Sequence, residues 1–399
     1  MKKFLALLLL AACCGQAAWA AVPKSEPLPE ELRLISKRGI DAIYAVDLGE
    51  AQKEFEFALS KYPDHPFPHF GLAMTKWATL EYLEDESDPK LDKEYGVLTD
   101  KAIAVGKAWL AKHPGDANAY MCMGGMYGLR ARLAVLQHRW IKAYFDGRKA
   151  LSYMHQSLKI DPQLYDAYLG LGMYEYYSGT LTGVVKILAK LVMPGDARKG
   201  IELLNVCREK GYFNALAAKL LLIEIYTTTG SRYENPALAV KWSKELLAAY
   251  PGHPQMQFVD IVSLFEDKQY EASRKESLDY LKAVNEGKPA YRKRYLPRVL
   301  TAIGTTYLVE KNYDLAAEYF AKAAATLKDD PAAHPARWGV WAIVRLGNVY
   351  DLKGQRAKAL ECYREAKTYK DEWGFSESIG GYLKKPYTEA ALPGQMPPP

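Results

Sequence analysis

Two stretches near the C-terminal end of the sequence decide the fold: LPRVLTAIGTTYLVEKNYDLAAEYFAKAAATL (296–327) and WAIVRLGNVYDLKGQRAKALECYREA (341–366). In both, a glycine is followed by a tyrosine at +3, an alanine at +12, an aromatic residue at +16 and another alanine at +19. This spacing predicts two antiparallel helices joined by a tight turn. The positions are Gly304, Tyr307, Ala316, Phe320 and Ala323, and then Gly347, Tyr350, Ala359, Tyr363 and Ala366.

The residue types suit such a helical hairpin. Glycine and alanine occur where two helix backbones approach closely, because a larger side chain would push them apart. The aromatic residue at +16 fills the space between one hairpin and the next. Each hairpin leaves an apolar face that only the following hairpin covers, so the pattern predicts an array of hairpins.

Looser copies of the pattern continue through the chain. One first helix, around residue 124, has its partner late, near residues 150–162, which predicts about four extra turns of helix in that hairpin. We count about eight hairpins over residues 30–370. The further structural positions are Gly39, Ala51, Phe55 and Ala58 near the N-terminus, and Gly124, Tyr127 and Gly172 in the middle of the chain.

These segments resemble tetratricopeptide repeats (TPRs), whose pattern extends over about 34 residues. The resemblance implies an all-α fold, a TPR-type α-solenoid of about eight helical hairpins, some with long insertions. It also implies that the first helices line a concave groove for partner segments. Transferring the family's groove positions to this sequence gives Met173, Tyr176, Tyr177, Arg298, Thr305, Trp341 and Asn348 as candidate binding residues, with Asp166 also at a groove position.

One function of the family is not expected. TPR proteins that clamp acidic chaperone tails carry Lys and Asn at two groove positions of the first repeat, where this chain has Ser36 and Ile40.

The N-terminus resembles an export signal. Residues 1–20 (MKKFLALLLLAACCGQAAWA) combine two lysines, a short apolar run and a small-residue site before Ala21. A second cleavage site, before Cys13, resembles a bacterial lipobox, so a lipid on Cys13 is the alternative. We therefore expect a periplasmic or secreted protein, or an outer-membrane lipoprotein. The expected organisation is a signal peptide (1–20), a linker (21–29), a solenoid (30–371) and a cap with a flexible tail (372–399).

Composition and motifs point away from other functions. The net charge of +6 in 399 residues is too small to indicate a nucleic-acid binder. A zinc-peptidase motif, a nucleophile elbow and a phosphate loop are all absent from the sequence. His65 and His69 lie close together but lack further ligands for zinc. We expect no enzymatic activity, no cofactor and no metal, and we expect Cys122, Cys207 and Cys362 to be small buried residues rather than a disulfide framework.

Three segments interrupt the pattern. Residues 84–96 are acidic and predict a loop or irregular insertion. Residues 178–196 are apolar with two lysines, which suits either a helix packed across the solenoid edge or an interfacial membrane helix. The basic run 291–295, with Arg298, is interpreted as a solvated lead into a helix or as a site for an anionic partner.

The expected function is a non-catalytic protein–protein interaction scaffold of the bacterial cell envelope, which binds partner segments in the groove. The alternatives are a glycan-binding module in envelope or polysaccharide assembly, with Tyr176 stacking on sugars, and a peripheral membrane protein.

Overall fold

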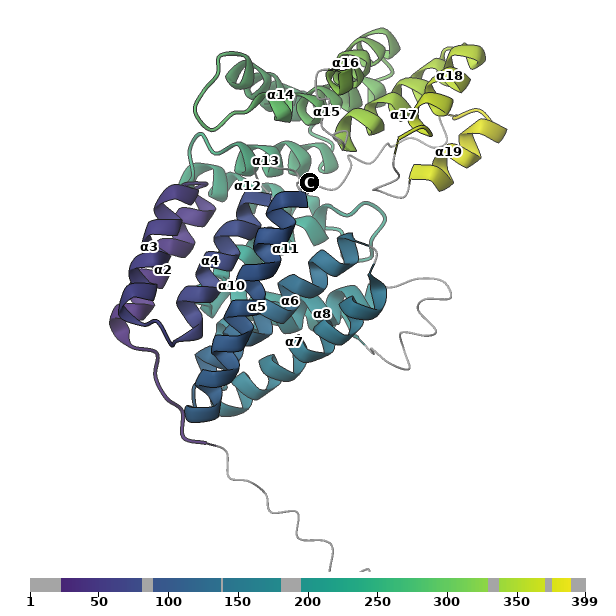
Figure 1. Ribbon diagram of the computed structural model, residues 1–399. Helices are drawn as coiled ribbons and strands as arrows, with labels where there is room; N and C mark the ends of the chain where they lie inside the picture. The colour runs from purple at the N-terminus through teal and green to yellow at the C-terminus, as the bar shows by residue number, and fades with distance from the viewer. Residues whose placement is uncertain are drawn as a thin grey trace, which may run out of the picture.

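The computed structural model describes residues 23–80, 89–137, 139–180, 195–328, 337–369 and 375–388. Within these ranges the secondary structure is helical throughout, and no strand occurs. The N-terminal hairpins form the lower body of the molecule, and the C-terminal hairpins continue above it (Figure 1).

Consecutive helices pack as eight hairpins in the described part of the chain, as the sequence predicts. Three short 3₁₀ turns lie at Tyr165–Ala167, Lys293–Tyr295 and Thr326–Lys328, and a last helix, α19 (Phe375–Lys384), follows the eighth hairpin. The hairpins are α2 (Glu30–Tyr44) with α3 (Leu48–Lys61), α4 (Pro66–Ala78) with α5 (Pro89–Lys112), α6 (Ala117–Leu136) with α7 (Trp140–Ile160), α8 (Tyr168–Thr180) with α10 (Ala197–Lys210), α11 (Ala215–Thr227) with α12 (Pro236–Ala249), α13 (Pro254–Glu266) with α14 (Tyr270–Asn285), α15 (Leu296–Val309) with α16 (Tyr313–Ala325), and α17 (Arg337–Leu352) with α18 (Arg356–Ala366).

In three hairpins, an aromatic residue of the second helix packs on a glycine of the first helix. A Cβ added at Gly39 would lie 2.7 Å from the Phe55 ring, and one added at Gly71 of the following hairpin would lie closer still. Phe55 therefore fills the space between α2 and α4. The same contact joins Phe320 to Gly304 and Tyr363 to Gly347, where a Cβ would lie 2.8 and 2.6 Å from the ring.

The other repeat positions are buried or partly buried. Gly124 packs against Met154, and Gly172 packs against Leu204. A Cβ at either glycine would be too close to these side chains. Tyr307 and Tyr350 are partly buried. The fully or almost fully buried positions are Ala51, Ala58, Tyr127, Ala316, Ala323, Ala359 and Ala366.

The third hairpin has the predicted extra length. α6 has 20 residues and α7 has 21, whereas α15 and α16 have 14 and 13. Each helix of this hairpin is thus longer by about two turns.

The prediction of a loop over 84–96 is wrong for residues 89–96. These residues begin α5, because Tyr95 is fully buried against Trp77 of α4, with ring centroids 5.5 Å apart. Residues 84–88 lie outside the described part of the chain. The apolar segment 178–196 is described only at its ends, where 178–180 finish α8 and Asp196 caps α10.

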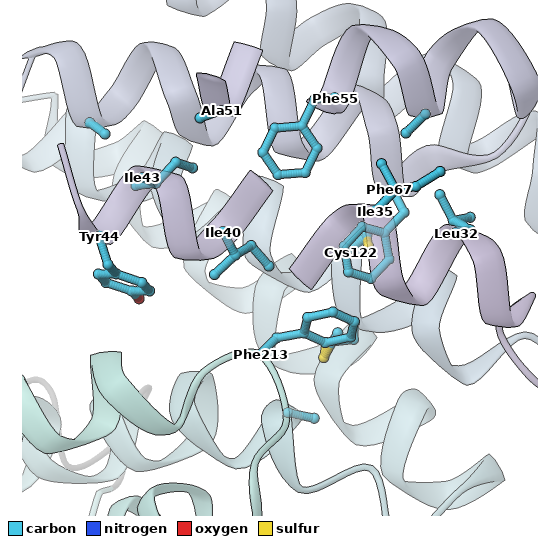
Figure 2. Packing of buried hydrophobic residues seen from close by; sticks show 14 of the residues in the cluster. Leu32, Ile35, Ile40, Ile43, Tyr44, Ala51, Phe55, Phe67, Cys122 and Phe213 are labelled. Carbon is cyan, nitrogen blue, oxygen red and sulfur yellow. The ribbon is translucent and has the colours of Figure 1, made fainter. Parts of the chain in front are cut away.

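The N-terminal hairpins curve until α2 meets the start of α11. Phe213 inserts into the cluster formed by α2, α3 and α4, below Ile35, Ile40 and Phe67 (Figure 2). Its ring centroid lies 5.0 Å from that of Phe67. The groove positions of the first hairpin, Ser36 and Ile40, are buried in this contact region.

The C-terminal helix covers the last hairpin. Phe375 of α19 stacks on Trp341 of α17, with centroids 4.8 Å apart. Behind it, the carboxylate of Asp351 accepts hydrogen bonds from the guanidinium of Arg356, the hydroxyl of Tyr363 and the backbone N–H of Tyr387. With the bonds from Arg356 to the carbonyls of Tyr382 and Leu383, they hold the end of α19 and the chain after it against α17 and α18.

Other expectations from the sequence can be compared with the described residues. Cys122, Cys207 and Cys362 are buried free thiols, which confirms their interpretation as packed residues. His65 accepts from the N–H of Phe67 through Nδ1 and contacts Asp116 through Nε2, so it caps α4. In the described ranges, no helix is long and apolar enough to cross a membrane, and no group of three His, Cys, Asp or Glu residues is placed to hold a metal ion.

Candidate partner-binding surface

The first helices of successive hairpins contact one another along one side of the array. α2 touches α4, α4 touches α6 and α6 touches α8, and the same holds for α11, α13, α15 and α17. This side carries the seven candidate binding residues, and the structure places them in very different surroundings.

Three candidates lie inside the chain. Thr305 is fully buried, and its hydroxyl donates to the carbonyl of Thr301. Asn348 is also fully buried, and its amide donates to the Tyr363 hydroxyl over 3.0 Å. Tyr176 is only 6% exposed. These side chains serve packing between helices, because the first helices approach closely enough to cover them.

Trp341 and Arg298 are partly buried by their own neighbours. Trp341 lies between α17 and α19, where Phe375 covers one face of its indole and the guanidinium of Arg345 lies 4.4 Å from a ring centroid. Arg298 lies over the rings of Phe258 and Tyr295, at 4.5 and 4.4 Å. A cation so enclosed by aromatic rings stabilises the packing of α13 against α15.

The basic run 291–295 beside Arg298 also contains both buried and exposed residues. Tyr291 and Tyr295 are buried, whereas Arg292 and Lys293 are exposed. Arg298 also donates to Gln255 Oε1 (3.0 Å) and to the Tyr280 hydroxyl (2.6 Å), so its charge is held inside the array.

Tyr177, on α8, is the exposed member of the seven, at 43% of its surface, while Met173 one turn before it is partly buried. The hydroxyl of Tyr177 donates to Glu224 Oε1 on α11 over 3.2 Å. Its ring packs edge-to-face on Tyr176, with centroids 5.4 Å apart, and Tyr176 in turn contacts Tyr233. Tyr177 is thus held in place from below while its outer side is accessible.

Charges of both signs flank this ring. Desolvation and the nearby carboxylate of Glu224 raise the pKa of Tyr177, and the guanidinium of Arg132 opposes the rise. Arg132 is an exposed residue of α6 that lies over the ring of Trp77, 5.1 Å from its centroid. Tyr177, Arg132 and Glu224 come from three successive first helices, and we call them the Tyr177 surface.

The position of α8 depends on a buried carboxylate. Asp166, in the turn before α8, accepts from the backbone N–H groups of Tyr212, Phe213 and Asn214 at 3.1, 2.8 and 2.7 Å. These are the residues that lead into α11. Asp166 therefore fixes the spacing between α8 and α11, and with it the distance between Tyr177 and Glu224.

An exposed aromatic ring between a cation and a carboxylate is suited to binding, not to covalent chemistry. The ring offers a desolvating contact for an apolar side chain, and the flanking charges pair with polar groups of a ligand. The sequence singled out Tyr177 as a candidate but not its neighbours Arg132 and Glu224. In the sequence, Arg132 and Glu224 are marked only by their positions on first helices. The extra length of α6 conceals the repeat spacing that would have identified them.

One known protein family matches the C-terminal end of the array. Residues 342–372, in the eighth hairpin and the segment after it, match the family model of the tetratricopeptide repeat. No curated protein sequence matches the chain.

Several solved structures are similar to this chain over 89% of its length. They include the APC/C hetero-tetramer Cut9–Hcn1 (13% identity, TM-score 0.44, 63% of that chain covered) and yeast Tom70 (12%, 0.37, 90%). A third is a tetratricopeptide repeat protein from Parabacteroides merdae (11%, 0.32, 98%). The chain thus spans less than two thirds of the first of these structures.

Proposed function

We propose that this α-solenoid, which carries a tetratricopeptide repeat at residues 342–372, is a non-catalytic scaffold of the bacterial cell envelope that binds a segment of a partner protein on the Tyr177 surface. The TPR fold is one of protein–protein interaction. Placement in the envelope rests on the leader-like residues 1–20 alone. In this proposal, a lipid on Cys13 is the alternative to a free periplasmic chain.

The observation that carries the proposal is the contrast between Tyr177 and the other candidates. Thr305, Asn348 and Tyr176 are enclosed by the array, so a partner cannot reach them in this conformation. Tyr177 presents an aromatic ring that a partner can desolvate, which is a typical anchor of protein interfaces. The bound segment places an apolar side chain on this ring and an acidic group near Arg132.

The test is cross-linked affinity capture from native envelopes with the exported protein as bait. Tyr177→Ala is expected to lose the partner that the wild type enriches, because removing an interface anchor costs about 2 kcal/mol or more. The matched control is Phe57→Ala. Phe57 is an aromatic residue of similar exposure (46%) on α3, a second helix.

Two results would contradict the proposal. One is equal capture by wild type and Tyr177→Ala, with the helical content of both unchanged. The other is saturable oligosaccharide binding that Tyr177→Ala abolishes while no protein is captured. Trp341→Ala and Tyr176→Ala are unsuitable as probes, because both rings support helix packing and their loss changes stability as well.

A further inference from the structure

The start of α7 exposes a group of large apolar side chains. Trp140, Ile141 and Phe145 are 60%, 76% and 58% exposed, and Tyr144, which packs edge-to-face on Phe145, is partly exposed. At 100° per residue these four lie on one side of the helix, opposite the buried Ala143. We call them the α7 tip face.

The tip face lies on the extra turns of the third hairpin. Met154 of α7 packs on Gly124 as Phe320 of α16 packs on Gly304, which aligns the two hairpins. In that alignment α7 begins about two turns earlier than α16, so residues 140–146 are the additional part. The aromatic residues therefore lie at the free end of the hairpin, about 10 Å beyond the equivalent end of a hairpin of ordinary length.

The tip is held in place by ion pairs to the buried carboxylate of Asp146. Asp146 accepts from Arg130 Nε (2.8 Å) and Nη2 (2.6 Å), and from Lys142 Nζ (3.1 Å). On α5, Asp100 pairs with the same arginine, and Asp92 accepts from Gln137. These contacts attach α6 and α7 to each other and to α5, so the apolar face is presented by an ordered helix.

The exposed charged residues of α7 itself are positive. Asp146 is the sole acidic residue within α7, and its carboxylate is neutralised by its two partners. The exposed side of the helix continues with Arg148, Lys149 and Lys159, and Arg139 precedes its first turn. Apolar and aromatic side chains at a helix end, followed by basic residues, are complementary to a surface that is apolar inside and anionic outside.

We propose that the α7 tip face docks on the surface of a bilayer that contains anionic lipids. Trp140 and Tyr144 lie at the level of the headgroups, where such rings are favoured, and Ile141 and Phe145 enter the acyl boundary. Arg148 and Lys149 pair with lipid phosphates. This docking is independent of the Tyr177 surface, which lies on α6, α8 and α11.

The test is flotation of the purified chain with vesicles. The chain from Ala21 onward is used, because it keeps every described residue and removes the apolar leader, which binds lipid by itself. Vesicles of phosphatidylcholine with phosphatidylglycerol are compared with vesicles of phosphatidylcholine alone. The wild type is expected to float with the anionic vesicles and to bind them less at high salt.

Variants separate the two contributions. The double variant Ile141→Ser, Phe145→Ser is expected to bind the anionic vesicles at least about tenfold more weakly, because it removes the inserted apolar area. Arg148→Gln with Lys149→Gln is expected to reduce binding and its salt dependence. Phe57→Ser, which replaces an exposed aromatic residue on α3 (46%), is expected to bind like the wild type.

The proposal is overturned if the wild type stays with the unbound fraction in the presence of anionic vesicles. It is also overturned if the Ile141→Ser, Phe145→Ser double variant floats as well as the wild type, or if Phe57→Ser weakens binding equally. Capture of an acidic protein through the tip face, without flotation, would assign the face to a protein partner instead. All variants replace exposed side chains, and circular dichroism checks that each remains folded.

Discussion

Replacing Asp166 with alanine tests how the array holds its curvature. The carboxylate is almost fully buried and accepts from three consecutive backbone N–H groups at 3.1, 2.8 and 2.7 Å. A buried donor left without an acceptor costs about 1–3 kcal/mol. The N–H of Phe213 is buried and takes this full cost, whereas those of Tyr212 and Asn214 are partly buried and regain some hydrogen bonding from water.

A second effect acts in the opposite direction. Burial raises the pKa of Asp166 because the ionised carboxylate is poorly solvated. Removing this carboxylate therefore recovers part of the stability that the lost hydrogen bonds cost. We therefore expect Asp166→Ala to destabilise the protein by about 2–3 kcal/mol. Asp166→Asn keeps one acceptor oxygen without the charge and is expected to cost about 1–2 kcal/mol.

Urea unfolding followed by circular dichroism measures the total effect, and hydrogen exchange followed by mass spectrometry locates it at residues 212–214. Asp161→Ala is the matched control, since Asp161 accepts from the exposed N–H of Gln163 and its loss is expected to cost less than about 0.5 kcal/mol. If Asp166→Ala behaves like Asp161→Ala and leaves exchange at 212–214 unchanged, then the carboxylate does not hold α8 to α11.

Two further predictions concern helix contact and pH. A Cβ at Gly304 would lie 2.8 Å from the Phe320 ring, so Gly304→Ala is expected to destabilise the protein by about 1–3 kcal/mol in thermal unfolding. Gly380→Ala in α19, where a Cβ meets no atom within 4 Å, should be neutral or stabilising, and equal effects would disprove the close contact. His253 Nδ1 accepts from two N–H groups at the start of α13, and burial lowers the pKa of this side chain. The unfolded chain therefore binds the proton more tightly than the folded chain. We expect the free energy of unfolding to fall as the pH drops below about 6.5. His253→Asn keeps a capping oxygen and should weaken this pH dependence; an unchanged pH profile would contradict the role of His253.

The pairing of helices could be predicted from the sequence because it depends on local spacing. The distance from Gly304 to Phe320 is fixed by one hairpin, so the contact between them follows from the pattern alone. The extra length of the third hairpin could also be predicted, because it lengthens the sequence between Gly124 and its contact Met154. Local geometry repeats along a solenoid, and a repeat is visible in a single sequence.

The accessibility of the groove could not be predicted in this way. It depends on curvature, which brings Phe213 to Phe67 and Tyr212 under Arg33, pairs separated by more than a hundred residues. Small changes in the angle between neighbouring hairpins decide whether such residues meet. The transferred positions Thr305 and Asn348 are also enclosed, and Asn348 donates to Tyr363 on the second helix of its own hairpin.

The two proposed surfaces contain large side chains that the array does not enclose in its own packing. Phe258, Arg298 and Trp341 hold helices together, and each would expose or unpair a neighbour if a partner displaced it. A partner that binds the outer side of Tyr177 or of the α7 tip face does not displace these side chains, because those sides contact solvent. Their chemistry differs as well. One ring between opposite charges selects a polar segment with an apolar anchor, whereas an apolar helix end whose exposed charged residues are basic selects an anionic surface. Because these features lie on different helices, a scaffold attached to a bilayer through α7 keeps α8 and α11 free to hold a protein.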